Sequence, residues 1–205
     1  MRKMIIGIDL DNTIICYDDL FHQLAVERKL VSRDFAPRKD KIRNFLRSQN
    51  MEPVWTEMQG YVYGQRILEA KPFEGVFEFF SECGRRDVEV HIISHKTQYP
   101  FLGPKFDLHD AALSWLEYNR FLDPGYLGLD KRCIHLEFTK EAKYKKIREC
   151  ACTHFIDDLP EFLVDSNFPD YVVRILFDNF ALHQRMDGML HASSWSEIAR
   201  IVFGD

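Results

Sequence analysis

Short apolar runs recur along the chain, and each is followed by polar residues or by a stretch rich in Gly and Pro. Short, nearly continuous apolar runs are typical of strands that are buried on both faces, as in a parallel sheet. Segments with helical spacing separate them, and this alternation predicts βαβ units in a doubly wound, Rossmann-like α/β sheet. The predicted strands are residues 4–8, 88–93, 133–138, 153–156 and 172–177.

A different pattern fills residues 16–71. Apolar residues recur there at helical spacing in three stretches, which begin near Tyr17, Pro37 and Pro53. We therefore predict a small all-helical insertion at residues 16–71, carried by an α/β core domain of residues 1–15 and 72–205.

Composition narrows the class of protein. A chain of 205 residues with 46% hydrophobic and 29% charged residues is typical of a globular protein, and no run reaches the length of a membrane span or a signal-peptide core. The net charge of −5 gives no support to a nucleic-acid or anionic-membrane partner. Five scattered cysteines without a Cys-x-x-Cys pair indicate a reduced, cytoplasmic protein, with neither a zinc site nor a disulfide expected.

Polar side chains stand where the predicted strands end: Asp9 and Asp11, then Ser94, then Asp157 and Asp158. A local turn would also explain the first pair, because Asp favours turns. However, the carboxyl ends of parallel strands meet at one edge, where ligands bind. Carboxylates gathered there repel one another unless a cation joins them, and oxygen ligands favour Mg²⁺. The sequence therefore predicts a magnesium site that handles phosphate.

A lysine near the start of the helix before residues 153–156 would balance further negative charge. Lys143 is the preferred residue, because Ile147 one turn later indicates a buried helix face. Lys140 lies nearer to Thr139, the predicted N-cap, and remains an alternative.

In this order along the chain, the motifs resemble those of the haloacid dehalogenase (HAD) superfamily: Asp-x-Asp-x-Thr, a Ser, a Lys and an acidic pair. The resemblance covers residues 1–15 and about 72–180, and it implies that residues 16–71 form a C1-type cap that covers the site and selects the substrate. The matching residues are Asp9, Asp11, Thr13, Ser94, Lys143, Asp157 and Asp158.

The resemblance also implies a role for each catalytic residue. Asp9 would attack phosphorus and form a phosphoaspartyl intermediate, and Asp11 would act as general acid and then as general base. Ser94 would donate a hydrogen bond to a phosphoryl oxygen, and Lys143 would offset negative charge. His95 either touches the substrate or is a loop histidine.

For the metal, the resemblance implies Mg²⁺ held by Asp9, Asp157 and the backbone carbonyl of Asp11, with Asp158 binding directly or through water. A helix N-cap before Leu159 is the structural alternative for the acidic pair.

The implied function is a Mg²⁺-dependent phosphomonoester hydrolase (phosphatase) that acts on a small soluble phosphorylated metabolite. A 5′-nucleotidase-like enzyme and a sugar-phosphate phosphatase are specific versions of this function. A non-catalytic phosphate-binding or regulatory protein with the same fold is the alternative from another class. A signalling receiver domain is excluded, because its acidic pair lies on the first strand. The substrate and the oligomeric state stay open.

Overall fold

The computed structural model describes residues 3–204, and the chain divides there into two compact units. The α/β unit comprises the chain up to Ile14, Pro72–Lys96 and the chain from Arg120 on. The helical unit comprises Ile15–Lys71 and Thr97–Asn119. The sequence had assigned residues 97–119 to the core domain, whereas in the structure they group with the helical segment.

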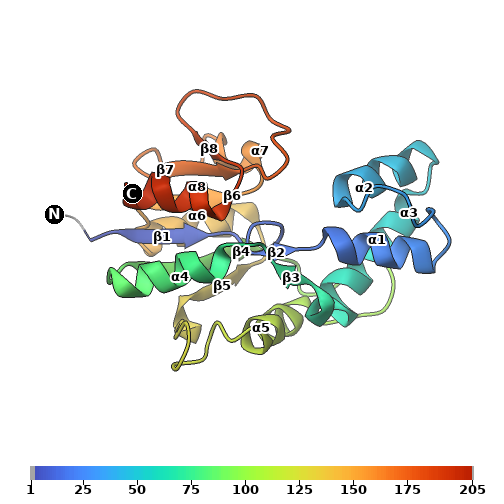
Figure 1. Cartoon of the computed structure of the whole chain (residues 1–205), viewed down its shortest axis with the longest axis horizontal. Helices are drawn as coiled ribbons and strands as arrows, with labels where there is room; N and C mark the ends of the chain where they lie inside the picture. The colour runs from blue at the N-terminus through green and yellow to red at the C-terminus, as the bar shows by residue number, and fades with distance from the viewer. Residues whose placement is uncertain (1–2, 205) are drawn as a thin grey trace. The chain divides into compact units, whose positions relative to one another are not determined.

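The α/β unit is built on a parallel sheet, which confirms the predicted fold class (Figure 1). Within the described residues its six strands have the order β5-β4-β1-β6-β7-β8. The strands are β1 (Ile5–Ile8), β4 (Glu89–His95), β5 (Ile134–Glu137), β6 (His154–Asp157), β7 (Val173–Phe177) and β8 (Leu190–Ala192). Of these six strands, β8 had no predicted counterpart.

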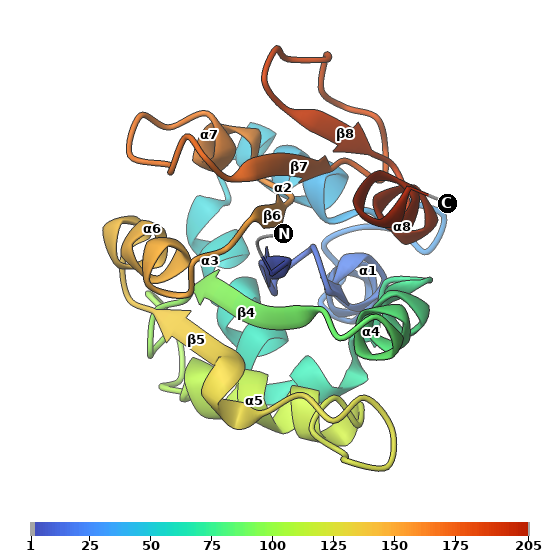
Figure 2. The ribbon, with the colours of Figure 1, turned by 90° about the vertical axis from the view of Figure 1, so that its left-hand side faces the viewer.

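Helices cover both faces of this sheet (Figure 2). On one face lie α4 (Val76–Arg85) and α8 (Trp195–Phe203), and the rings of Phe79 and Trp195 meet at 5.0 Å between centroids. On the other lie α6 (Lys140–Glu149) and the short α7 (Pro160–Leu163), where Tyr144 stacks on Phe162 at 4.5 Å. Thr139 is the N-cap of α6, as predicted, and its Oγ1 accepts from the amide of Ala142 at 3.1 Å.

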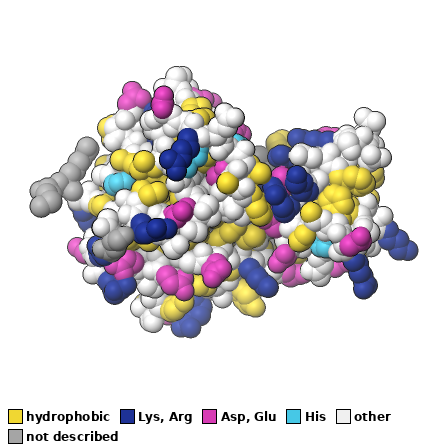
Figure 3. All heavy atoms as spheres, turned by 45° about the horizontal axis from the view of Figure 1, so that its top comes forward, with side chains coloured by type: hydrophobic (Ala, Val, Ile, Leu, Met, Phe, Trp, Pro, Cys, Tyr) yellow, Lys and Arg dark blue, Asp and Glu magenta, His cyan; other side chains and the backbone are white. Residues whose placement is uncertain are grey.

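Apolar packing, not surface charge, holds the α/β unit together. Acidic and basic side chains are interspersed over the face of this unit that Figure 3 shows. Exposed ion pairs contribute on the order of 0–1 kcal/mol each. The buried cluster between the sheet and α6 includes Ile93, Ile147, Phe155, Phe162 and Leu176, all at most 1% exposed.

The helical unit is built from short helices and a pair of short strands. Three helices were predicted in residues 16–71, and the structure forms α1 (Asp18–Glu27), α2 (Lys39–Ser48) and α3 (Glu52–Gly60) there. A π-helix η1 (Tyr61–Gln65) and a 3-10 turn η2 (Ile67–Glu69) follow, and the short strands β2 (Ile15–Cys16) and β3 (Lys71–Pro72) pair with each other.

Residues 97–119 join this unit through α5 (Leu108–Tyr118). Trp115 is fully buried, and its indole Nε1 donates to the carbonyl of Ala70 at 2.8 Å. Within residues 3–204, none of the helices combines the length and the apolar character needed to span a bilayer.

Candidate active site

Two carboxylates occupy neighbouring positions at the carboxyl edge of the sheet. In the pairing of β1 with β6, Ile8 lies opposite Ile156, so Asp9 and Asp157 follow at the same level. The amide of Asp9 donates to the carbonyl of Ile156 at 2.9 Å. Asp9 is 6% exposed and Asp157 is 0% exposed. Carboxylates buried this deeply need a positively charged partner.

Lys143 supplies that partner from the first turns of α6. Its Nζ lies 2.6 Å from Oδ1 of Asp9 and 2.7 Å from Oδ2 of Asp157, and the side chain is only 3% exposed. The ammonium also lies 4.1 Å from the ring centroid of Phe162. Lys140, the alternative at the sequence level, is exposed. The structure therefore places Lys143, and not Lys140, among the carboxylates.

Burial and charge act on these groups in opposite directions. Burial raises the pKa of Asp9 to about 7; Lys143 counteracts this rise, while Asp157 and Asp11 add to it. Burial by itself would lower the pKa of Lys143, but the charges of Asp157 and Asp9 outweigh it and raise that pKa above its ordinary value. The lysine is therefore a fixed cation, whereas the pKa of the Asp9 carboxyl group lies near neutral pH.

Asp158 completes a group of acidic side chains. One oxygen each from Asp9, Asp157 and Asp158 lie within 4.8 Å of one another. The amide of Leu159 donates to Oδ1 of Asp157 at 2.9 Å, which is a local turn bond. The N-cap of α7 is Leu159 itself and no side chain caps this helix, so the helix N-cap considered for the acidic pair is wrong.

The turn after β1 is held in place by the rest of the α/β unit. Asn12 has a left-handed φ of 60°, and the amide of Ile14 donates to the carbonyl of Leu10 at 3.0 Å. The indole Nε1 of Trp195 in α8 donates to the carbonyl of Thr13 at 3.1 Å. The hydroxyl of Thr13 is buried and has no hydrogen-bond partner among the described residues. These contacts fix the backbone that carries Asp9 and Asp11.

Ser94 lies near the end of β4, and a second buried lysine, Lys96, directly follows the strand. Side chains alternate along a strand, so Ser94 and Lys96 share one side while His95 points to the other. Ser94 is 1% exposed and Lys96 is 3% exposed. Nζ of Lys96 lies 2.6 Å from Oδ2 of Asp11. His95 is exposed, and its Nε2 lies 3.1 Å from the carbonyl of Phe138.

Solved structures share this architecture over nearly the whole chain. A HAD-superfamily hydrolase from Ehrlichia chaffeensis matches with a TM-score of 0.55 and 10% identity, covering 100% of this chain and 98% of that one. A HAD family hydrolase from Deinococcus radiodurans with bound phosphate and sodium matches with a TM-score of 0.57 and 11% identity, covering 98% and 96%. A dehalogenase matches with a TM-score of 0.59 and 11% identity, covering 98% and 97%. The chain has the HAD hydrolase fold.

At the level of sequence, no protein-family model and no curated protein matches the chain. Within the HAD fold, the structure brings together Asp9, Lys143, Asp157 and Asp158, as the motifs led us to expect. Asp11 belongs to the same edge but is paired with Lys96.

Lys96 was not among the predicted site residues. The signal that could have found it is the two-residue alternation of a strand, which puts position 96 on the same side as position 94. His95 was considered as a substrate contact because it is the direct neighbour of Ser94; in the structure its Nε2 lies near the carbonyl of Phe138.

The acidic group of this HAD-fold site fits a hard divalent cation. All three side chains offer carboxylate oxygens, which Mg²⁺ prefers. Lys143 contacts one oxygen of Asp9 and one of Asp157, which leaves Oδ2 of Asp9 outside the contact with the ammonium.

Proposed function

We propose that the chain is a Mg²⁺-dependent phosphomonoester hydrolase that acts on a small phosphorylated metabolite through a phosphoaspartyl intermediate. The observation that carries this proposal is the buried ammonium of Lys143, in contact with Asp9 and Asp157 beside Asp158. A fixed cation next to carboxylates can bind a phosphoryl group and a divalent ion. Buried ion pairs by themselves are weak contributors to stability, so a purely structural role explains these buried charges less well.

In the first half-reaction, Asp9 is the nucleophile. Its carboxylate attacks phosphorus, the bond from phosphorus to the ester oxygen breaks, and the leaving alcohol takes a proton from Asp11. Lys143 stabilises the charged carboxylate beforehand and the developing charge on the phosphoryl oxygens afterwards. Ser94, buried at the end of β4, donates a hydrogen bond to one of these oxygens.

In the second half-reaction, water hydrolyses the acyl phosphate and Asp11 takes up its proton. The contact of Asp11 with Lys96 favours the carboxylate that accepts this proton. The preceding acid step needs Asp11 with a proton, and the contact with Lys96 opposes that form.

The residues that would hold Mg²⁺ are Asp9, Asp157 and Asp158 through carboxylate oxygens, and Asp11 through its backbone carbonyl. When bound, the ion neutralises charge and orients the phosphoryl group.

Dehalogenase chemistry is the main alternative for a chain with this fold. The dehalogenases of the superfamily that this chain resembles lack both the acid/base aspartate and the metal. Asp11 and the acidic group around Asp157 therefore favour phosphate-ester hydrolysis. The proposal places the enzyme in the cytoplasm, acting on a small molecule and not on nucleic acid or a membrane.

A substrate screen tests the proposal. Nucleotides, sugar phosphates and phospho-amino acids are offered with Mg²⁺ and with EDTA, and released phosphate is measured. We expect hydrolysis that needs Mg²⁺ and is lost in Asp9→Asn. Asp170→Asn is the matched control, because the Asp170 side chain is 100% exposed. Hydrolysis that persists in Asp9→Asn with EDTA would refute the mechanism.

A further inference from the structure

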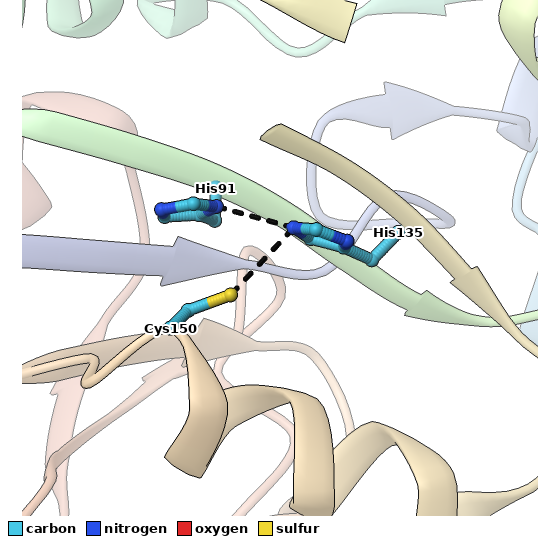
Figure 4. Close-up of side chains that lie close together, drawn as sticks. All are labelled: His91, His135 and Cys150. Atoms are coloured by element: carbon cyan, nitrogen blue, oxygen red, sulfur yellow. Dashed lines mark hydrogen bonds between the residues drawn. The ribbon is translucent and has the colours of Figure 1, made fainter. Parts of the chain in front are cut away.

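Two histidines and a cysteine meet on the face of the sheet that α6 covers (Figure 4). His91 belongs to β4, His135 to β5, and Cys150 directly follows the last residue of α6. Because Ile93 and His135 are paired, and His91 lies two positions before Ile93, the two imidazoles stand on the same face. His91 precedes Ser94 by three positions, which is roughly 10 Å along a strand, so this cluster is distinct from the carboxylate site.

The three donor atoms are close enough to share one ion. Nδ1 of His91 lies 3.2 Å from Nε2 of His135, and Sγ of Cys150 lies 3.6 Å from the same Nε2. All three atoms lie within 4.8 Å of one another. Zn²⁺ with bonds of about 2.05 Å to nitrogen and about 2.3 Å to sulfur spaces tetrahedral ligands about 3.3 Å (N to N) and about 3.6 Å (N to S) apart. Both measured edges match this geometry.

The carboxylate of Glu89 contacts the second ring nitrogen of His91. Nε2 of His91, the ring nitrogen that points away from the cluster, lies 2.9 Å from Oε1 of Glu89. Oε2 of Glu89 in turn accepts from Nζ of Lys3 at 3.0 Å. A carboxylate on the second nitrogen of a metal-binding histidine fixes the tautomer that leaves the first nitrogen able to bind. Here it would present the lone pair of Nδ1 to the ion.

We propose that His91, His135 and Cys150 form a second metal site, which takes Zn²⁺ or a similar borderline-soft divalent ion, with water as the fourth ligand. Cys150 binds as the thiolate, so one proton is released when the ion enters. Nitrogen and sulfur donors distinguish this site from the all-oxygen carboxylate site and select a different kind of ion.

The ion would join β4, β5 and the end of α6, so its role is to stabilise the α/β unit. Since the unfolded chain does not hold the three donors together, binding energy adds to the free energy of unfolding. The site does not depend on the proposed phosphatase activity. It revises the expectation of no zinc, which rested on spacing in sequence; the ligands come from three separate elements.

Cobalt substitution tests the site directly. Co²⁺ is added to the whole chain in excess Mg²⁺, which occupies the carboxylate site. We expect a thiolate-to-cobalt charge-transfer band for one equivalent, and a rise in melting temperature with Zn²⁺. Cys150→Ser should abolish the band, and His135→Gln should abolish tight binding. Glu89→Gln should weaken Co²⁺ binding roughly 10–100-fold.

Matched controls separate this site from other thiols and histidines. Cys133→Ser and His183→Gln should leave the band unchanged, since Cys133 is not part of the cluster and His183 is exposed. Circular dichroism establishes whether each variant is folded. If Cys150→Ser does not fold, the weaker Co²⁺ binding expected of Glu89→Gln tests the site instead. The proposal is overturned if wild-type protein shows no band with excess Co²⁺, or if the band survives Cys150→Ser or is unaffected by Glu89→Gln.

Discussion

The ammonium of Lys96 lies 2.6 Å from Oδ2 of Asp11, and this contact joins residues 85 positions apart in sequence. The side chain of Lys96 is 2% exposed, whereas that of Asp11 is 20% exposed. A buried ammonium at this distance favours the charged form of its carboxylate partner. Under the proposed function, Lys96 is therefore a positioning residue that biases Asp11 toward the form that accepts a proton.

Replacing this lysine tests that role. In Lys96→Met, Asp11 loses the cation that favours its carboxylate, so the acidic limb of the pH–rate profile should move to higher pH. Acid–base catalysis contributes roughly 10²–10⁴-fold, so we expect kcat to fall at least about tenfold while Mg²⁺ dependence remains. Lys145→Met is the control, because that side chain is 77% exposed. An unchanged profile in Lys96→Met would show that the contact has no influence on Asp11.

Lys143 should matter for stability as well as for activity. Its ammonium is in contact with two buried carboxylates, and removing one partner of a buried ion pair costs about 3–5 kcal/mol. Lys143→Met should therefore lower the free energy of unfolding by about that amount, as measured with urea. Lys140→Met, on the exposed side of the same helix, should change it by no more than about 0.5 kcal/mol. Similar free energies of unfolding for the two variants would show that the contact of Lys143 with Asp9 and Asp157 does not stabilise the fold.

The raised pKa of Asp9 predicts that the free energy of unfolding of the metal-free protein depends on pH. Burial raises its pKa in the folded state to about 7, against 3.8 for the ordinary carboxyl group. Its contribution to stability is therefore fully present below about pH 4 and is lost as the pH rises through about 7. The amide introduced by Asp9→Asn does not titrate, so the free energy of unfolding of wild type should fall relative to this variant between about pH 4 and about pH 8. One pKa unit corresponds to about 1.4 kcal/mol, so the divergence should reach a few kcal/mol.

The measurement is urea unfolding of both proteins in EDTA across this pH range. Mg²⁺ added at the upper end should restore the stability of wild type more than that of Asp9→Asn, because the ion offsets the charge of the buried carboxylate. Parallel pH curves for the two proteins would contradict the raised pKa of Asp9.

The carboxylate edge could be predicted because it depends on local patterns and one topological rule. Apolar runs located β1, β4 and β6, and parallel pairing then placed Asp9, Ser94 and Asp157 at one edge of the sheet. The choice between Lys140 and Lys143 depended on where α6 begins, and Thr139 fixes that start in the structure. The chemical roles of these residues remain predictions.

Other features depend on contacts that no local pattern contains. Strand β8 has only three residues, Leu190–Ala192, with a histidine in the middle, so it shows no apolar run. The apolar stripe of α5 predicts a helix but does not tell which unit it packs against, and the bond from Trp115 to Ala70 decides this. The cluster around His135 likewise arises only when β4, β5 and α6 come together.

Gly7 offers a test of how tightly β1 packs beside the site. A Cβ at this position would lie 2.7 Å from Cε2 of the buried Phe155 and 3.0 Å from Sγ of Cys152, so Gly7→Ala must displace an aromatic ring in the core. Overpacking of this kind costs about 1–3 kcal/mol. Gly84 in α4 is the matched control, since a Cβ there has no heavy atom of the described chain within 4 Å. Gly84→Ala should stabilise the protein by up to about 0.5–1 kcal/mol, because alanine is a better helix former than glycine in the last turn of α4. Both substitutions restrict the unfolded chain equally, so this effect cancels in the comparison. A lower free energy of unfolding for Gly7→Ala and a higher one for Gly84→Ala, measured with urea, would show the tight packing of Gly7 against Phe155. Changes of the same sign would contradict it.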